Sequence, residues 1–478
     1  RRREAHFSDR KGMQNAKAFV SPIPGVKSWK FFWGALLIVV ILSGILNFTC
    51  LDWGLPNGNS WHSDSIAGNT TLNEIPRLFG TWTNKYPRLH FIICGSFYKW
   101  YLADWQKHPV YGVDGKGNQV ARVLDISRMS KLILVSNTLS ALMGVGAVMA
   151  VFLTARLLFG DILSAFLPSL ALACSHIFVF YSHLGNLDVP CTFWIAWSIY
   201  WAVKAAYLGR WHHYILLGVF CACAVCTKDP AAGFVVGIGF SVWLGLVGKA
   251  RDEGRSYRDG IFAVFTVKVL AAILALVLVF ALLNGIFTSP RAFLQRMGHW
   301  IGGPGTTEYT GGYRGQWPLM VEAFYKLWYS VGWPFLLAII LSLVYSIYRI
   351  RWKTGFAILP LLCFYLVVVM RVHQVQSRYL IPGLTGLVLL LGISAGDFLR
   401  WSKVSRVIRV VLVGTIYGLS FLYCMGGNLE MAEDSRIQVE KWFEQNVSRR
   451  SPIVAVCPVT YAPRLHMLGF RCDFRWSP

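Results

Sequence analysis

The stretch that decides the fold is LILVSNTLSALMGVGAVMAVFLTARLL, residues 132–158, in which Arg156 is the single charged residue. About 20 apolar residues are enough for a helix to cross a bilayer, and core helices of soluble proteins rarely sustain so long a run. The whole chain of 478 residues is similarly apolar, with 14% charged residues and a mean hydropathy of +0.48. The sequence therefore predicts an integral membrane protein.

Comparable apolar runs recur along the chain and predict about eleven membrane-spanning helices, which makes the expected fold class an all-α polytopic membrane protein. Two runs, 214–226 and 380–393, are short for a span, so flanking residues must extend them or the surrounding bilayer must be thin. The predicted spans are 31–50, 132–158, 162–181, 191–208, 214–226, 231–247, 261–287, 327–347, 356–370, 380–393 and 407–425.

The basic residues between these spans predict the orientation of the chain. Lys and Arg concentrate in short cytoplasmic loops, and alternation of the spans places every basic segment on one side. The N-terminus is therefore expected in the cytoplasm and the C-terminus outside. The same pattern accounts for much of the net charge of +23 and excludes a nucleic-acid partner. The basic segments are 1–30, 204–210, 249–258, 349–353 and 400–409.

Three regions are predicted. Residues 1–30 form a basic cytoplasmic tail, 31–426 a transmembrane catalytic domain, and 427–478 an external segment that is expected to belong to a truncated soluble domain. Within the membrane domain, 51–131 is a large first external loop whose stretch 89–105 suits a helix lying in the membrane interface. The second external piece, 288–326, is rich in glycine and aromatic residues and is expected to be a mobile loop.

The eleven cysteines do not form a disulfide framework, because most lie in or beside apolar helices, where a thiol behaves as a small hydrophobe. The spacing of Cys223 and Cys226 resembles a metal or redox motif, but the segment is helical and lacks a second ligand pair. Cys457 and Cys472 both fall in the external segment and are the one pair predicted to form a disulfide.

Charged side chains gather at the predicted outer ends of the spans, with Lys268 as the main mid-span exception. Asp64 and Asp188 follow the first and third spans, so both emerge on the same external face. An ion-coupled transporter would instead keep ionisable groups near the bilayer midplane. This layout suits chemistry on a substrate with a phosphate at headgroup depth and a long apolar tail.

Five short motifs follow one another along the chain: Trp61-His62-Ser63-Asp64-Ser65, Asn84-Lys85-Tyr86-Pro87-Arg88-Leu89, Asp188-Val189-Pro190, Thr227-Lys228-Asp229-Pro230 and Arg378-Tyr379-Leu380-Ile381-Pro382. In order and sidedness they resemble those of the GT-C glycosyltransferases that use polyprenyl-phosphate sugars, in particular the protein O-mannosyltransferase and aminoarabinose transferase branch. The first motif resembles the His-Pro-Asp-Glu type, but Ser63 and Ser65 replace its Pro and Glu, and Arg88 replaces the second Pro of Tyr-Pro-Pro.

The resemblance implies transfer of a sugar from a lipid phosphate carrier to an acceptor hydroxyl, usually with inversion at the anomeric carbon. Such a reaction needs a base for the hydroxyl and cations for the charge that grows on the departing phosphate. Asp64 is the predicted catalytic base, and Asp188 is predicted to hold acceptor or donor sugar. The alternative is that each carboxylate only caps a helix or orients a loop.

Cationic and ring side chains are predicted to bind the substrate. The cations are expected at the phosphate, because a partly dehydrated phosphate needs positively charged partners. The alternative for each cation is an ordinary position at the membrane interface, with its charged end reaching water. The histidines are treated as hydrogen-bonding groups, because no HxH or HExxH spacing is present. The predicted substrate-binding residues are Lys85, Lys228, Arg378, Tyr379, His62 and His183.

The expected function is thus a membrane glycosyltransferase acting on the extracytoplasmic face. It requires no cofactor beyond the polyprenyl-phosphate sugar that serves as donor, and a divalent metal is not expected. The acceptor is a protein, a lipid or a glycan. The alternatives are a lipid or polysaccharide transporter and an inactive subunit that binds lipid-linked sugars. A bacterial cytoplasmic membrane is favoured over the endoplasmic reticulum, because no long luminal domain is appended.

Overall fold

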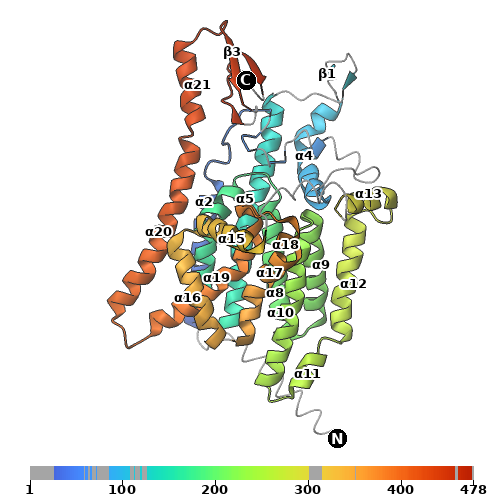
Figure 1. Cartoon of the computed structure of the whole chain (residues 1–478), viewed down its shortest axis with the longest axis vertical. Helices are drawn as coiled ribbons and strands as arrows, with labels where there is room; N and C mark the ends of the chain where they lie inside the picture. Colours follow the sequence, from blue (N-terminus) through green and yellow to red (C-terminus); the bar gives the residue numbers. More distant parts are fainter. Residues whose placement is uncertain are drawn as a thin grey trace.

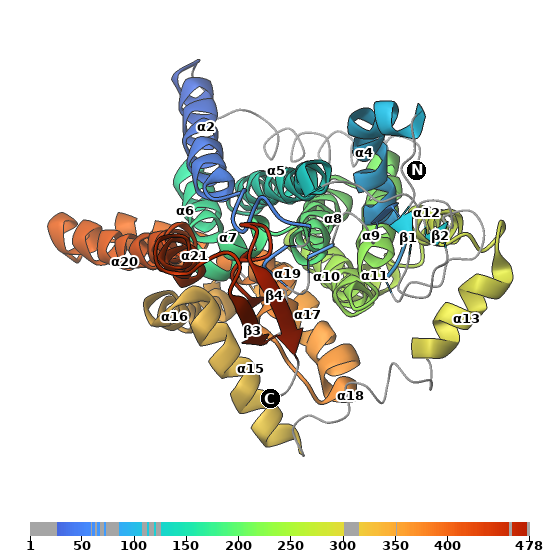
Figure 2. The same cartoon turned by 90° about the horizontal axis from the view of Figure 1, so that it is seen from above.

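The computed structural model describes residues 26–58, 60–62, 65–66, 71–72, 86–107, 112–113, 119–120, 126–300, 315–349, 351–457 and 461–475. These residues form a helical bundle with a small two-stranded sheet above one end (Figures 1 and 2). The first helices are α2 (Val26–Phe48), α4 (Leu89–Lys107), α5 (Ile126–Phe159), α6 (Ile162–Ala173), α7 (His176–Ser182), α8 (Asp188–Leu208), α9 (Trp211–Thr227), α10 (Ala231–Asp252), α11 (Tyr257–Phe262) and α12 (Val267–Leu283).

The later elements complete the bundle. Two very short strands, β1 (Gly112–Val113) and β2 (Gln119–Val120), pair antiparallel between α4 and α5. The later elements are α13 (Pro290–Trp300), α15 (Gln316–Val331), α16 (Trp333–Arg349), the 3-10 turn η2 (Arg351–Thr354), α17 (Gly355–Phe364), the π-helical turn η3 (Tyr365–Val369), α18 (Met370–Val372), α19 (Ser377–Arg400), α20 (Arg406–Ala432), α21 (Ser435–Asn446), β3 (Pro452–Val456) and β4 (Arg471–Arg475).

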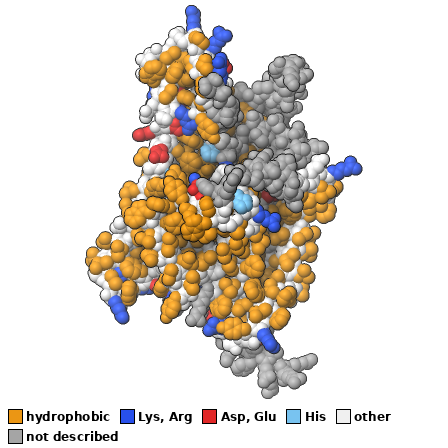
Figure 3. All heavy atoms as spheres, viewed as in Figure 1, with side chains coloured by type: hydrophobic (Ala, Val, Ile, Leu, Met, Phe, Trp, Pro, Cys, Tyr) orange, Lys and Arg blue, Asp and Glu red, His pale blue; other side chains and the backbone are white. Residues whose placement is uncertain are grey.

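Glycines allow the central helices to pack with their backbones in close contact. A Cβ atom on Gly237 of α10 would lie 2.2 Å from the carbonyl oxygen of Leu359 in α17. Likewise, a Cβ on Gly386 of α19 would lie 2.4 Å from the carbonyl oxygen of Ala357. Membrane helices associate mainly through close van der Waals packing, because lipid is as apolar as the helix surfaces and the hydrophobic effect does not drive them together. Small residues at helix contacts permit this close packing. The side chains facing outward on the side seen in Figure 3 are mostly hydrophobic.

Every predicted span overlaps a helix, but the count of eleven is not confirmed. In the described part of the chain, seven helices are long and apolar enough to cross a membrane, or up to nine if each of two bent pairs is one span. The predicted spans outside this count are those of α8 and α9. Tryptophan and tyrosine lower the hydropathy of α8, and α9 has only 17 residues.

Two predicted spans are broken rather than continuous. The helices α6 and α7 meet at a bend of 62°, and α15 and α16 meet at a bend of 116°. Gly332 lies at the second break with φ +78°, a backbone conformation that residues other than glycine rarely adopt. Pro334 follows two residues later. The range 288–326 was expected as a loop, yet α13 and the first part of α15 make much of it helical.

The C-terminal region contains the helix α21 and the strands β3 and β4, but the predicted disulfide is wrong. Strands β3 and β4 pair in parallel, with Ile453 opposite Cys472 and Val456 opposite Arg475. Cys457 directly follows β3 and comes four residues after Ile453, the residue opposite Cys472. At about 3.3 Å per residue, the two positions are about 13 Å apart along the strand. A disulfide requires Cα atoms within about 7 Å, and both thiols are free.

Candidate active site

The site is built where α8 begins, α9 ends and α19 begins. Asp188 is the first residue of α8 and is 4% exposed. Asn186 orients it twice: its side-chain nitrogen donates to Asp188 Oδ2 at 3.1 Å, and its oxygen accepts from the Asp188 backbone at 3.1 Å. The turn depends on Gly185, because a Cβ there would lie 2.6 Å from Ser136. The Asp188 carboxylate is thus fixed before any ligand binds.

Lys228 lies directly against this carboxylate. It ends α9 with an extended backbone, two residues before Pro230, where a helix cannot continue without losing a backbone donor. Its ammonium group forms an ion pair with Asp188 Oδ1. Burial alone would lower the pKa of Lys228, but the carboxylate of Asp188 outweighs burial and raises it. Lys228 is therefore a fixed cation with 14% of its side chain exposed.

Tyr379 connects this pair to a second cation. The ring centroid of Tyr379 is 5.1 Å from the Lys228 ammonium nitrogen and 5.4 Å from the guanidinium carbon of Arg378. Arg378 and Tyr379 both belong to the first turn of α19. Cations are attracted to the face of an aromatic ring at such distances. The structure therefore brings together four of the predicted site residues: Asp188, Lys228, Arg378 and Tyr379.

A second ion pair beside Lys228 was not predicted. Arg296 of α13 donates to both oxygens of Asp229, at 2.9 and 2.8 Å, and to Asn284 Oδ1 at 2.7 Å. Arg296 is only 6% exposed, so these bonds are largely shielded from water. They attach α13 to the turn that carries Lys228. The amphipathic pattern of α13 was the available signal, but its partner could not be read from the sequence.

The two predicted histidines have different surroundings. His62 packs edge-on against the rings of Tyr181 and Phe180, with centroids 5.6 and 6.0 Å away. Burial, with a smaller effect of Arg378, lowers the pKa of His62 to about 4, so its ring is neutral at pH 7. His183 is 1% exposed, and its Nε2 bonds to the carbonyl of Leu46 at 2.9 Å. That bond fixes the end of α2.

Asp64 and Lys85, the predicted base and the third predicted phosphate ligand, lie outside the described residues. His62, two residues before Asp64, and Tyr86, directly after Lys85, are described. Among the described residues, no group of three or more His, Cys, Asp or Glu side chains is arranged to hold a metal ion.

Two cavities of about 490 and 510 Å³ open beside His62 and Tyr181. They share Trp53, Glu430 and Asp434, so we treat them as one cleft, called the external cleft. Its walls combine rings with charged groups, a composition that suits polar ligands with flat apolar faces. The remaining lining residues are Trp61, His62, Ser435, Arg436 and Tyr461 on one side and His176, Ile177, Phe180, Tyr181, Lys326, Tyr329, Gln376, Ser377, Gly427 and Met431 on the other.

The C-terminal region forms one wall of the external cleft and is tied to the first external loop. The indole nitrogen of Trp53 donates to Asp434 Oδ2 at 3.0 Å. Two guanidinium groups contact the ring of Trp61, that of Arg436 at 4.1 Å and that of Arg464 at 4.9 Å from the ring centroid. Trp61 is 1% exposed. The segment that carries His62 is therefore held by the last part of the chain.

The helical bundle has a GT-C-like fold. Residues 129–251, less than half of the chain, match the family model described as dolichyl-phosphate-mannose-protein mannosyltransferase. The matched range contains α8 and Asp188. The GT-C resemblance predicted from the five motifs is thus confirmed for the fold.

Among solved structures, the chain is similar to ArnT from Cupriavidus metallidurans bound to undecaprenyl phosphate, with 13% identity, 92% of this chain and 86% of that chain covered, and a TM-score of 0.51. It is also similar to the oligosaccharyltransferase AglB from Archaeoglobus fulgidus in complex with an inhibitory peptide and a dolichol-phosphate. There the identity is 13%, the coverage 94% of this chain and 64% of that chain, and the TM-score 0.50. No curated protein matches the sequence.

Proposed function

We propose that the protein is a membrane glycosyltransferase that moves a sugar from a polyprenyl-phosphate carrier to an acceptor hydroxyl. The observation that carries the proposal is the cluster in which Lys228 and Arg378 flank Tyr379 while Asp188 fixes Lys228. Undecaprenyl phosphate in ArnT and dolichol-phosphate in AglB are ligands of proteins with this fold. A carrier phosphate is the ligand that such a cluster suits.

In the proposed reaction, the oxygen of the acceptor hydroxyl attacks the anomeric carbon of the donor. The bond from that carbon to the phosphate oxygen breaks, and the electron pair leaves with the phosphate. Lys228 and Arg378 stabilise the charge that develops on the phosphate, because they are already in place and need no reorganisation. The ring of Tyr379 contacts both cations.

Asp64 is the proposed base, which takes the proton of the acceptor hydroxyl as the new bond forms. Asp188 acts indirectly, by holding Lys228, since its carboxylate already accepts from Lys228 and Asn186. The acceptor approaches through the external cleft, which His62 lines. The neutral ring of His62 can accept or donate a hydrogen bond there. We propose no metal and no other cofactor for this reaction.

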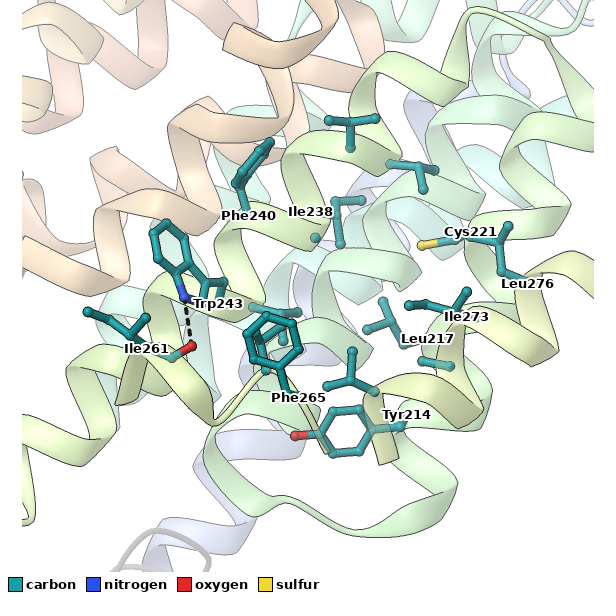
Figure 4. A pocket seen from close by; sticks show the side chains of 18 residues that line it. Tyr214, Leu217, Cys221, Ile238, Phe240, Trp243, Ile261, Phe265, Ile273 and Leu276 are labelled. Carbon is teal, nitrogen blue, oxygen red and sulfur yellow. Dashed lines mark hydrogen bonds between the residues drawn. The ribbon is translucent and has the colours of Figure 1, made fainter. Parts of the chain in front are cut away.

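An apolar groove lies within reach of the apolar chain of a donor whose phosphate is bound by the cations. A cavity of about 580 Å³ lies between α9, α10 and α12, with apolar side chains such as Leu217, Ile238 and Phe265 on its walls (Figure 4). Lys228 stands where α9 ends and just before α10 begins. At 1.5 Å per residue, the lining from Val235 to Trp243 on α10 lies about 10–22 Å from Lys228. A polyprenyl chain of many carbons reaches that far.

The distribution of charge supports an enzyme over a transporter. In the described residues, apart from the bent helix α15, no Asp or Glu occupies the middle of a membrane-spanning helix. Lys268, the predicted mid-span exception, instead stands in the first turn of α12 and donates to the carbonyl of Gly209 at 2.7 Å. Acidic groups therefore do not line a path through the bundle, as a coupled transporter requires.

The basic loops favour an extracytoplasmic site, and a bacterial cytoplasmic membrane remains our proposed location. The function is tested with the full chain in proteoliposomes and a panel of radiolabelled polyprenyl-phosphate sugars. Asp64→Asn, Lys228→Gln and the distant control Arg255→Gln are compared with the unaltered chain. We expect transfer by the unaltered chain and the control, and its loss in the two site variants. The absence of transfer with every donor would instead support a transporter or an inactive subunit.

A further inference from the structure

A second cavity with charged walls lies at the opposite end of the bundle from the candidate active site. Its volume is about 380 Å³, and the ends of α5, α8 and α10 contribute Phe159, Tyr207 and Arg251 to its walls. The helix α8 starts at Asp188, and its 21 residues span about 31 Å. This length equals the hydrocarbon thickness of a bilayer, so the cavity lies at headgroup depth in the other leaflet.

Three cations face this cavity against one acid, Asp252. The side chain of Arg251 makes no hydrogen bond or ion pair with any residue that the structure describes, and its guanidinium lies 5.6 Å from the ring of Tyr257 and 6.0 Å from the ring of Trp352. Arg349 lies 3.6 Å from Asp397 and also interacts with the hydroxyl of Tyr345, and its side chain is 61% exposed.

The third cation, Lys353, is partly used by the protein. Its ammonium donates to the carbonyl of Leu158 at 2.7 Å and lies 5.9 Å from the ring of Tyr207. The opposite wall is apolar and includes Leu158, Phe159 and Ile393. Trp352 is fixed over α10 because Gly248 has no side chain, and a Cβ there would lie 2.5 Å from Trp352. The cavity thus joins two guanidinium groups with a rigid apolar and aromatic wall.

We propose that this cavity binds the phosphate of an anionic phospholipid in the leaflet opposite the active site. Guanidinium groups bind phosphate oxygens through paired N–H donors. Basic pockets between membrane helices at headgroup depth are suited to acidic lipids, whose acyl chains continue along apolar helix surfaces. The net positive charge of the lining favours an anionic lipid over a zwitterionic one. This site does not depend on the proposed glycosyltransferase activity.

The test measures radiolabelled phosphatidylglycerol and phosphatidylcholine retained by the purified full chain in detergent. The variant Arg251→Gln/Arg349→Gln removes both guanidinium groups. Its matched control is Arg255→Gln/Arg258→Gln, which removes the same charge from residues just beyond α10 that do not line the cavity. We expect the variant to retain about tenfold less phosphatidylglycerol, with the control within about twofold of the unaltered chain.

A second variant, Asp252→Asn, removes the single acid of the lining and should increase phosphatidylglycerol retention, a gain that misfolding cannot produce. Equal retention of the two lipids, or equal losses in variant and control, would overturn the proposal. A parallel arm uses inorganic phosphate without added lipid and follows thermal unfolding. Stabilisation by phosphate that Arg251→Gln/Arg349→Gln abolishes, together with unchanged lipid retention, would assign the site to a soluble phosphate compound and reject the lipid.

Discussion

The ammonium group of Lys228 is ion-paired with the carboxylate of Asp188, which lies 40 residues earlier in the chain. The pair joins the end of α9 to the start of α8, and both side chains are largely buried. A buried pair of this kind contributes little net stability, but removing one partner leaves the other charge without compensation. Lys228 and Asp188 therefore depend on each other both for folding and for the shape of the site.

Removing either partner should lower stability. We expect Asp188→Asn and Lys228→Gln each to destabilise the protein by about 3 kcal/mol, because an unpaired buried charge remains. Thermal unfolding in detergent measures this loss. The double variant Asp188→Asn/Lys228→Gln should recover much of it, since no charge is then left unpaired. Additive losses in the double variant would show that the two groups do not interact.

Tyr379 provides a ring face rather than a hydroxyl to its two cations. Tyr379→Phe should therefore keep near-normal transfer, while Tyr379→Leu should raise the KM for the donor about fivefold, the value of one cation–ring interaction of about 1 kcal/mol. Steady-state kinetics with a fixed acceptor and varied donor gives both numbers. Equal effects of the two substitutions would point to the hydroxyl instead.

Arg296 should hold α13 against the turn that carries Lys228. Arg296→Gln leaves the Asp229 carboxylate without its two bonds, so we expect a loss of about 3 kcal/mol in stability. Arg291→Gln on the same helix is the matched control, because Arg291 is exposed. Hydrogen exchange over 290–300 should rise in the first variant alone. Unchanged exchange there would contradict the proposed attachment.

His62 predicts a specific dependence of stability on pH. Its pKa in the folded protein, about 4, lies below the ordinary value of 6.5, so the unfolded chain binds more protons between these values. The contribution of His62 is complete above pH 6.5 and is lost as the pH falls toward 4. Between pH 7 and pH 5 we expect His62→Gln to lose about 2 kcal/mol less stability than the unaltered chain. Parallel pH curves for the two proteins would refute this.

Glu430 provides a test of the external cleft as the route of the acceptor. It lines both cavities, and its carboxylate has no hydrogen bond or ion pair with another described residue. Glu430→Gln should raise the KM for the acceptor severalfold and leave the KM for the donor unchanged. Glu433→Gln is the control, because Glu433 is exposed and does not line the cleft. A change in the donor KM alone would place the donor, not the acceptor, in this cleft.

Much of the fold could be predicted from local sequence, because a long apolar run has a single stable state in lipid. The broken spans could not, since the apolar run continues through Gly332 and Pro334, and glycine and proline also occur within continuous membrane helices. The disulfide prediction failed for a related reason. Two cysteines in one external segment gave no information on the register of β3 and β4, which places Cys472 opposite Ile453.

The candidate site was predictable where motifs contain the reacting groups, as with Asp188, Lys228, Arg378 and Tyr379. The contacts between them were not, because they join residues far apart in the chain. Arg296 was missed because it lies in a region without a recognised motif, and its partner Asp229 is 67 residues away. The wall of the external cleft formed by the C-terminal region was missed because no local pattern links Asp434 to Trp53.

The contacts between the first external loop and the C-terminal region also bear on how the protein is made. Asp434 bonds to Trp53 across 381 positions, and Arg464 donates to the carbonyl of Leu55 across 409. The ribosome synthesises the loop long before it synthesises Asp434 and Arg464. During synthesis the loop therefore lacks these contacts while the intervening helices enter the membrane one after another. The external cleft acquires both walls only after α20 has been inserted, so a nascent chain halted before that step lacks a finished cleft.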